Sequence, residues 1–214
     1  MHKFFLTVTA TAGLLGTIPA FADSVLVTSL QGEVTLEAAG IGKAPLEPFV
    51  RLRDGDRLGL GNGGKVSLVY VGKARLEAWQ GAGTIIVGES ESRAAGGKPQ
   101  VQVRSIPPEA ARQMNKTPST APDGRVGMMR MRGIPPQDSV SRLETEYRQL
   151  RDQLSADDML PEVMLLAGLF DLRQYERIEV ELTRISASYQ GNPALPALQS
   201  HYTKALAQAR APGK

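Results

Sequence analysis

The segment Lys65-Val66-Ser67-Leu68-Val69-Tyr70 decides the fold of the first half of this 214-residue chain. Its positions 66, 68 and 70 are apolar and alternate with Lys65, Ser67 and Val69. This period of two is typical of a β-strand that has one face in a core and the other in water. The same alternation recurs at Val34/Leu36, at Leu76/Ala78 and at Val101/Val103. Glycine-rich turns separate these segments, so we predict seven or eight short strands in residues 24–104. They would form a small antiparallel β-sandwich or barrel.

From Asp138 onward the apolar residues recur every three or four positions, which is the period of an amphipathic helix. Short breaks divide this region into four predicted helices. They run from Asp138 or Ser139 to about Leu154, from Ser155 or Asp158 to Phe170, from about Leu172 to Tyr189, and from about Ala194 onward. Helices joined by such brief turns pack as antiparallel hairpins. The predicted fold class is therefore α+β, with a β-sandwich or barrel followed by helical hairpins.

The residues between these two regions show neither period. Residues 106–137 contain several prolines, including Pro107-Pro108 and Pro135-Pro136, and we interpret them as an extended linker. Three methionines (Met128, Met129 and Met131) alternate with arginines there, and either pack on their own domain or dock on a partner. The predicted organisation is thus a β domain at 23–105, a linker at 106–137 and a helical domain at 138–210.

The first 22 residues have the features of a cleavable export signal. Lys3 supplies a positive charge, an apolar run follows from Phe4 to about Leu15, and Ala20-Phe21-Ala22 fits a signal peptidase. An uncleaved membrane anchor is the alternative, but this stretch contains threonines, glycines and a proline and lacks a basic flank. We therefore predict a periplasmic protein with no membrane span after cleavage.

Composition restricts the chemistry that the chain can perform. It has no cysteine, which excludes disulfides, thiol nucleophiles and cysteine-based metal sites. The 25 basic and 22 acidic residues give a net charge of only +3, without the clustered charge of a nucleic-acid surface. Within the predicted mature chain His201 is the single histidine, so a histidine metal site is not expected. We interpret His201 as a surface or half-buried helix residue.

We found no catalytic or cofactor motif. The stretch Gly59–Val66 differs by one residue from a phosphate-binding P-loop, but its Lys65 opens a predicted strand rather than a helix. The acidic pairs Asp157/Asp158 and Glu179/Glu181 are assigned to a helix start and to a solvent-exposed face. A hydrolase would need a carboxylate pair that the sequence does not reveal. We therefore predict a protein that is not an enzyme and binds no cofactor or metal.

The β region resembles the FecR domain, a periplasmic β module named after an iron-transport regulator. The resemblance rests on Gly32-Glu33-Val34, Pro45-Leu46, Leu52–Leu58, the strand Lys65–Tyr70, Leu76 and Ile85-Ile86. Within it, Gly55-Asp56 is interpreted as a turn whose carboxylate accepts backbone N–H groups. The cytoplasmic and transmembrane segments of typical members have no counterpart in this sequence, so we do not expect transmembrane signalling.

The helical region is similar to tetratricopeptide hairpins. The residues that carry this likeness are Leu172, Tyr175 and Ile178, together with the break at Asn192-Pro193. Arg173 stands where these repeats usually have glycine, and Ile178 where they have a small alanine. A plain four-helix bundle is the alternative.

Both resemblances imply binding rather than catalysis. We expect an exported envelope protein that acts as a protein–protein interaction, scaffold or regulatory module, with an envelope or outer-membrane protein as partner. The alternative is a periplasmic ligand- or glycan-binding module. Trp79, Arg75 and Tyr70 form the candidate binding surface, and Trp79 is expected either as a stacking platform on the outer face or buried against the linker or helices.

The export signal yields the first testable prediction, which is that the mature chain begins at Asp23. Replacing Ala22 with leucine should block processing, because a large side chain does not fit the small pocket at the cleavage site. The intact mass of the exported protein measures this. A mass that retains residues 1–22 would contradict the prediction.

Overall fold

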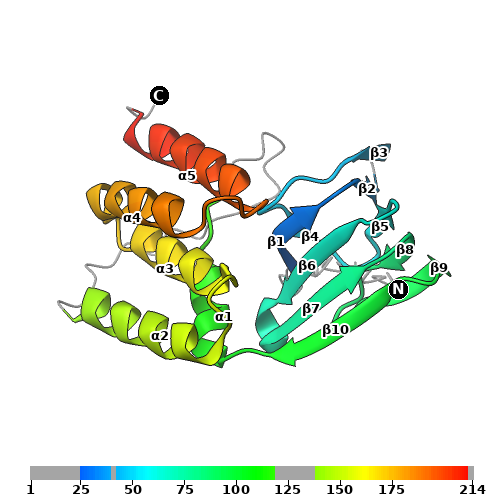
Figure 1. Ribbon diagram of the computed structural model, residues 1–214, viewed down its shortest axis with the longest axis horizontal. Helices are drawn as coiled ribbons and strands as arrows, with labels where there is room; N and C mark the ends of the chain where they lie inside the picture. The colour runs from blue at the N-terminus through cyan, green and yellow to red at the C-terminus, as the bar shows by residue number, and fades with distance from the viewer. Residues whose placement is uncertain (1–24, 40–41, 119–137, 212–214) are drawn as a thin grey trace, which may run out of the picture.

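The computed structural model describes residues 25–39, 42–118 and 138–211, which form three layers (Figure 1). The predicted α+β class is confirmed, with two antiparallel five-stranded sheets and, in the described residues, five helices. The sheets form a sandwich, and a closed barrel is not seen. The predicted export signal and the methionine cluster lie outside the described residues.

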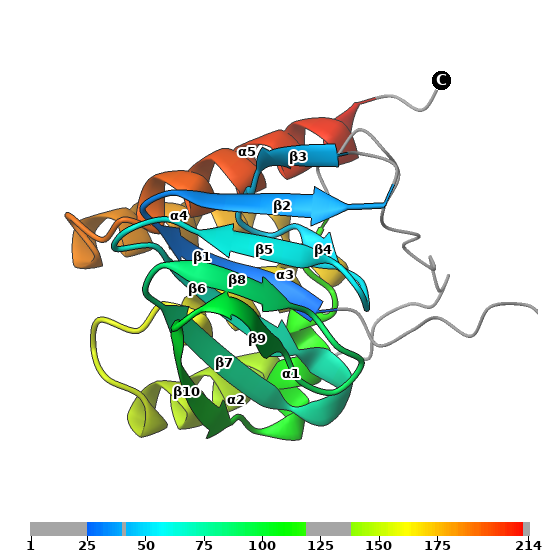
Figure 2. The ribbon, with the colours of Figure 1, turned by 90° about the vertical axis from the view of Figure 1, so that its right-hand side faces the viewer.

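Sheet A is the middle layer and has the order β10-β7-β6-β1-β4. Its strands are β1 (Val25–Gln31), β4 (Arg51–Leu52), β6 (Lys65–Tyr70), β7 (Arg75–Gln80) and β10 (Gln100–Ser105). Sheet B is the outer layer, in front in Figure 2, and has the order β3-β2-β5-β8-β9. Its strands are β2 (Val34–Ala38), β3 (Gly42–Pro45), β5 (Arg57–Leu60), β8 (Gly83–Ile86) and β9 (Arg93–Gly97).

A tight turn links β4 in sheet A to β5 in sheet B. Gly55 adopts a φ of 88°, a conformation that residues with a Cβ rarely adopt. The carboxylate of Asp56 accepts the backbone N–H of Arg53 at 2.9 Å, and the side chain is buried. The structural role that the sequence predicted for Gly55-Asp56 is therefore confirmed.

The helices form the third layer, against the face of sheet A that points away from sheet B (Figure 1). They are α1 (Pro108–Met114), α2 (Ser139–Gln153), α3 (Leu160–Asp171), α4 (Tyr175–Ser188) and α5 (Leu195–Arg210). The last four match the predicted helices within a few residues, and Pro161 lies in the first turn of α3. Arg173, just after α3, adopts a φ of 56°, in the region that favours glycine.

Helix α1 differs from the sequence prediction, because it lies inside the segment interpreted as an extended linker. Pro108 starts the helix without the loss of a hydrogen bond, and Ala110, Ala111 and Met114 are buried. At the end of α1 the guanidinium of Arg51 binds the side-chain and backbone oxygens of Asn115. The segment after β10 is thus packed on the protein up to Pro118.

Sheet A is covered on two faces, which corrects the simple alternation that the sequence predicted. Leu68 and Tyr70 face sheet B, whereas Val69, expected in water, is fully buried among the helices. Val101 and Val103, expected in the core, are 41% and 46% exposed at the edge. Val69 is buried because the helices cover the centre of sheet A. Val101 and Val103 are exposed because their strand, β10, lies at the edge of sheet A and projects beyond the covering layers.

The helices and sheet A share one hydrophobic core. Leu26, Val69 and Leu76 of the sheet belong to the same buried cluster as the inner faces of all five helices. A second cluster fills the space between the two sheets. The predicted β and helical regions are therefore joined by direct packing as well as by the chain.

His201 is buried, which corrects its interpretation as a surface or half-buried residue. Its ring packs 4.7 Å from that of Phe49, and only 6% of the residue is exposed. This burial lowers the pKa of His201 to about 4, so the imidazole is neutral at pH 7. The described residues contain no helix that is long and apolar enough to cross a membrane.

The shared core predicts one cooperative unfolding transition. Ile178 of α4 is fully buried in that core, so Ile178→Asp should destabilise the helices and sheet A together, by several kcal/mol. Fluorescence of Trp79, the single tryptophan, monitors the sheets, and circular dichroism at 222 nm monitors the helices. In urea, the unfolding midpoints measured by the two probes should decrease by the same amount. Val180→Asp, at a residue 68% exposed on the same helix, is the control. A Trp79 transition that stays at its wild-type midpoint would instead establish separate domains.

Candidate functional site

The structure brings the three sequence-predicted binding residues together, but Tyr70 and Trp79 lie in the interior of the sandwich and Arg75 is half-buried at its margin. Tyr70, Arg75 and Trp79 lie on the face of sheet A that points toward sheet B, where Tyr70 pairs with Arg75 across the ladder. Tyr70 is 1% exposed and Trp79 is 4% exposed. Trp79 therefore packs between the sheets, and not on an outer face or against linker or helices.

Glu77 organises this buried cluster, although the alternating pattern assigned it to water. Its carboxylate accepts the indole N–H of Trp79 at 3.0 Å, Nε of Arg75 at 2.8 Å and the backbone N–H of Ser92. The hydroxyls of Ser92 and Tyr70 lie 2.6 Å apart, and burial raises the pKa of Tyr70 to about 12. Because Ser92 lies between β8 and β9, Glu77 ties sheet B to sheet A. The cluster is a structural bridge between the two sheets.

A more accessible site lies on the opposite face of sheet A. The helices cover the row Leu26, Val69 and Leu76, but leave two further rows of the same face uncovered by helix. One row runs across four strands as Ser29, Ser67, Ala78 and Gln102, and the next as Gln31, Lys65, Gln80 and Gln100. Apart from Lys65 these side chains are small or carboxamide, and they give a flat floor about 14 Å wide, since neighbouring strands are about 4.8 Å apart.

This floor belongs to a groove of about 380 Å³ between sheet A and the helical layer. The other wall consists of the α2–α3 connection, with Ser155, Asp157 and Asp158, and of Asn192 and Pro193 before α5. Apolar residues of the shared core lie at its base: Phe49, Leu76, Met159, Leu160, Val163 and Leu198. In β1 the register shifts between Val27 and Ser29 beside this floor, and such bulges often occur next to binding sites.

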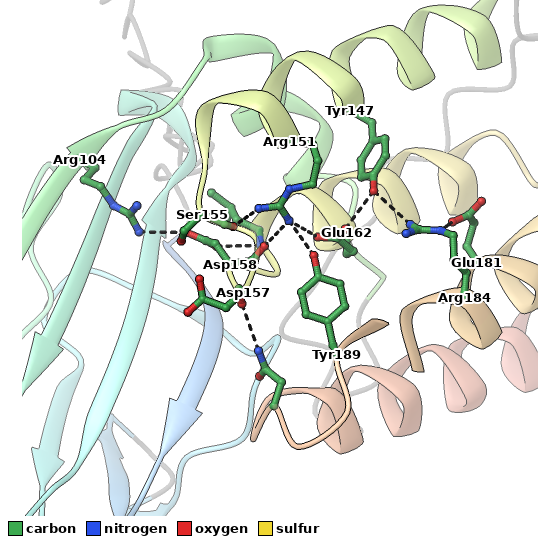
Figure 3. A network of polar contacts seen from close by, with 12 residues as sticks. Arg104, Tyr147, Arg151, Ser155, Asp157, Asp158, Glu162, Glu181, Arg184 and Tyr189 are labelled. Carbon is green, nitrogen blue, oxygen red and sulfur yellow. Dashed lines mark hydrogen bonds and ion pairs between the residues drawn. The ribbon is translucent and has the colours of Figure 1, made fainter. Parts of the chain in front are cut away.

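A network of polar contacts holds the helical wall of the groove in place (Figure 3). Arg104 of β10 bridges to Asp158 at 3.1 Å, which links sheet A to the α2–α3 connection. Asp158 also accepts the N–H of Leu160 at 3.0 Å, at the start of α3. From α2, Arg151 donates to the backbone oxygens of Ser155 and Asp158. The connection is therefore fixed at both of its ends.

Glu162 is the buried anchor of this network. It is 1% exposed, and its carboxylate accepts Arg151 at 3.2 Å and the hydroxyl of Tyr147 at 3.0 Å. Arg151 also donates to the hydroxyl of Tyr189 at 2.7 Å. Burial and the nearby Glu162 carboxylate raise the pKa of both Tyr147 and Tyr189, so both phenols stay neutral at ordinary pH.

The network continues to α4 through Arg184. Its guanidinium donates to the hydroxyl of Tyr147 at 3.2 Å and to Glu181 at 2.6 Å, and lies 5.7 Å from the centre of the Tyr147 ring. Figure 3 shows these side chains converging from α2, α3 and α4. The sequence pattern did not predict this site. The available signal was Glu162, the single charged residue in the apolar run 159–170.

In the part of the chain that the structure describes, no group of three or more histidine, aspartate or glutamate side chains is placed to hold a metal ion. Comparisons with models of protein families, with curated proteins and with solved structures find no match to this chain. The fold and the groove are thus the observations from which a function can be argued.

The Arg151–Glu162 pair predicts a large and specific loss of stability. Arg151→Met should lower the free energy of unfolding by about 2–4 kcal/mol, because it leaves a buried carboxylate without its cation. Arg148→Met on the exposed face of the same helix is the matched control, with an expected change within about 0.5 kcal/mol. Urea unfolding measures both.

A second variant separates the charge from the packing. Replacing both partners, in Arg151→Met/Glu162→Leu, should recover part of the lost stability, since no unpaired charge stays buried. If Arg151→Met were no more destabilising than Arg148→Met, the assignment of Arg151 as the cation of this network would be wrong.

Proposed function

We propose that this chain is a non-catalytic, exported envelope protein that acts as an interaction or scaffold module, with a FecR-like β region and tetratricopeptide-like helical hairpins. Its groove between sheet A and the helical layer binds an extended segment of an envelope protein partner. The observation that carries the proposal is the flat polar floor of Ser29, Ser67, Ala78 and Gln102 beside an apolar base.

The chemistry of the floor favours a polypeptide main chain. Each glutamine side chain offers a donor and an acceptor, the same pair of groups that a peptide unit presents. Gln31, Gln80 and Gln102 line the groove from three strands, and Asn192 adds a fourth carboxamide from the helical wall. An extended chain can therefore pair repeatedly along this surface without a requirement for one sequence.

The base of the groove supplies a hydrophobic anchor. Met159, Leu160 and Val163 border it, beside Leu76 of the sheet. An apolar centre with a polar rim is the usual anatomy of a protein–protein interface, and methionine adapts to side chains of different shape. One apolar side chain of the partner would insert here while its backbone follows the glutamines.

A structural role for the buried ionisable groups supports a non-catalytic function. Glu77 ties two sheets together and Glu162 of α3 binds two residues of α2, each in several hydrogen bonds. Groups held this firmly contribute to the shape of the groove rather than to proton transfer. Glu77 thus supports the sheet that forms the floor of the groove, and Glu162 supports its helical wall.

The glycan-binding alternative draws less support from this arrangement. Its stacking platform was Trp79, whose indole packs between the sheets and donates to Glu77. Sugar rings are usually bound against an exposed aromatic face, which the small floor residues Ser67 and Ala78 do not provide. A polypeptide therefore fits the groove better than a glycan.

Site-specific photo-crosslinking in the producing cells tests the proposal. A photoreactive amino acid at Ser67 or at Gln80 should capture the same discrete envelope protein, because both positions lie on the groove floor. Glu37, exposed on β2 of sheet B, is the control position and should give no adduct with that protein. Ala78→Trp, which fills the floor, should reduce the adduct at Gln80 at least tenfold.

Three outcomes would contradict the proposal. The first is equal capture from Glu37, which would place the interaction elsewhere. The second is loss of the adducts on addition of envelope oligosaccharides, which would favour a glycan as the ligand. The third is the absence of any adduct at both groove positions, which would refute a protein partner.

A further inference from the structure

The four edges of the two sheets are protected to different degrees. An exposed sheet edge presents unpaired backbone groups, and proteins usually block it with lysine, proline, bulges or short strands. In sheet B, β3 carries Lys43 and Pro45, and β9 ends in Gly96-Gly97 with a register shift against β8. In sheet A, β4 has two residues and its Arg51 binds the end of α1.

Strand β10, at the other edge of sheet A, lacks these devices. It has six residues, pairs with β7 without a register shift, and contains neither proline nor lysine. Every residue of β10 is exposed, and Val101 and Val103 are two of the three large exposed apolar residues in the described part of the chain. Figures 1 and 2 show β10 at the open margin of the sheet.

The hydrogen-bonding direction along β10 follows from its ladder with β7. Ile106, just after the strand, donates its N–H to the oxygen of Ala74 at 2.9 Å. Because antiparallel partners alternate, Gln100, Gln102 and Arg104 direct their backbone groups toward β7. Val101 and Val103 therefore direct their N–H and C=O groups outward, away from the sheet.

We infer that β10 pairs in antiparallel fashion with β10 of a second copy of this chain, so that two sheets A join into one continuous sheet. In the register centred on Gln102, Val101 lies opposite Val103 of the other copy, and each pair exchanges two backbone hydrogen bonds. Both valine pairs then lie on one face, and Gln100 lies opposite Arg104 on the other.

Among neighbouring registers, this one alone places both valines opposite valines of the other copy. A shift by two positions toward the C-terminus pairs Val103 with its own copy but places Val101 opposite Ser105, and a shift the other way pairs Val101 with its own copy but places Val103 opposite Pro99. Each shift therefore leaves one valine pair in place of two. The centred register also tolerates Pro99, because Ser105 of the other copy meets its carbonyl, which still accepts a hydrogen bond.

Disulfide trapping in the cysteine-free chain tests both the pairing and its register. Two copies of Gln102 would face each other at about 4.5 Å between Cα atoms, within the range that a disulfide requires. Gln102→Cys should therefore form a covalent dimer on mild oxidation of the purified full chain. Gln100→Cys is the matched control, because its two copies would lie about 14 Å apart along the joined strands. It should stay monomeric on a non-reducing gel.

Light scattering after size exclusion tests the same interface without cysteine. The unmodified chain at about 100 μM should have twice the monomer mass. Val103→Pro should give a monomer with an unchanged circular dichroism spectrum, because proline removes an N–H that points to solvent at an edge strand. Val180→Lys, at an exposed valine of α4, should stay dimeric.

Three results would overturn the inference. They are a monomer at 100 μM, a dimer that persists in Val103→Pro, and oxidation of Gln100→Cys as efficient as that of Gln102→Cys. If β10 instead pairs with a strand of a different protein, the purified chain would be a monomer at 100 μM.

Discussion

Burial of sheet A on two faces is the constraint on which the rest of the structure depends. The same strands must supply apolar residues to the inter-sheet core and to the helical core, as Leu68 and Val69 do at neighbouring positions. A surface buried twice requires a third layer, and the helical layer α1–α5 provides it. The helices leave part of that sheet face uncovered, and this part becomes the floor of the groove.

Two buried carboxylates fix how neighbouring elements pack, one between the sheets and one within the helical layer. Glu77 receives donors from both sheets, and Glu162 receives donors from α2 while Arg151 reaches to the end of α4. Apolar packing alone tolerates small sliding movements, whereas a buried charge is stable only where its donors lie within hydrogen-bond distance. These networks therefore fix the relative positions of elements that hydrophobic contacts merely hold together.

Much of the fold was predictable because local periodicity determines local structure. Strands β2, β6, β7 and β10, helices α2 to α5, Pro161 at a helix start and the Gly55-Asp56 turn follow from short-range patterns, whereas the described residues form ten strands where seven or eight were predicted. The burial of Glu77 and Val69, and the position of Trp79 between the two sheets, were not predictable in this way, because they depend on which layer covers which face. Alternation distinguishes two faces of a strand but does not reveal that each has its own core.

The groove shows the same limit at the level of the site. Polar residues such as Ser67 and Lys65 were recognised as one face of a strand, yet the opposing wall comes from residues 155–159, far along the chain. The short helix α1 was missed because the prolines around it indicate an extended segment. Its small buried alanines give a weak periodic signal, and its stability derives from contact with sheet A and α3.

The position of β1 in the sheet has a consequence for how the chain folds. It is the first strand of the described chain, yet it lies inside sheet A between β6 and β4, and Val25 pairs with Tyr70. The apolar strand β1 pairs only with strands that lie far along the chain. The fold is therefore rich in non-local contacts and is expected to form slowly. A chain delivered N-terminus first would present β1 long before β6 arrives. During that interval β1 is the segment most in need of protection from aggregation.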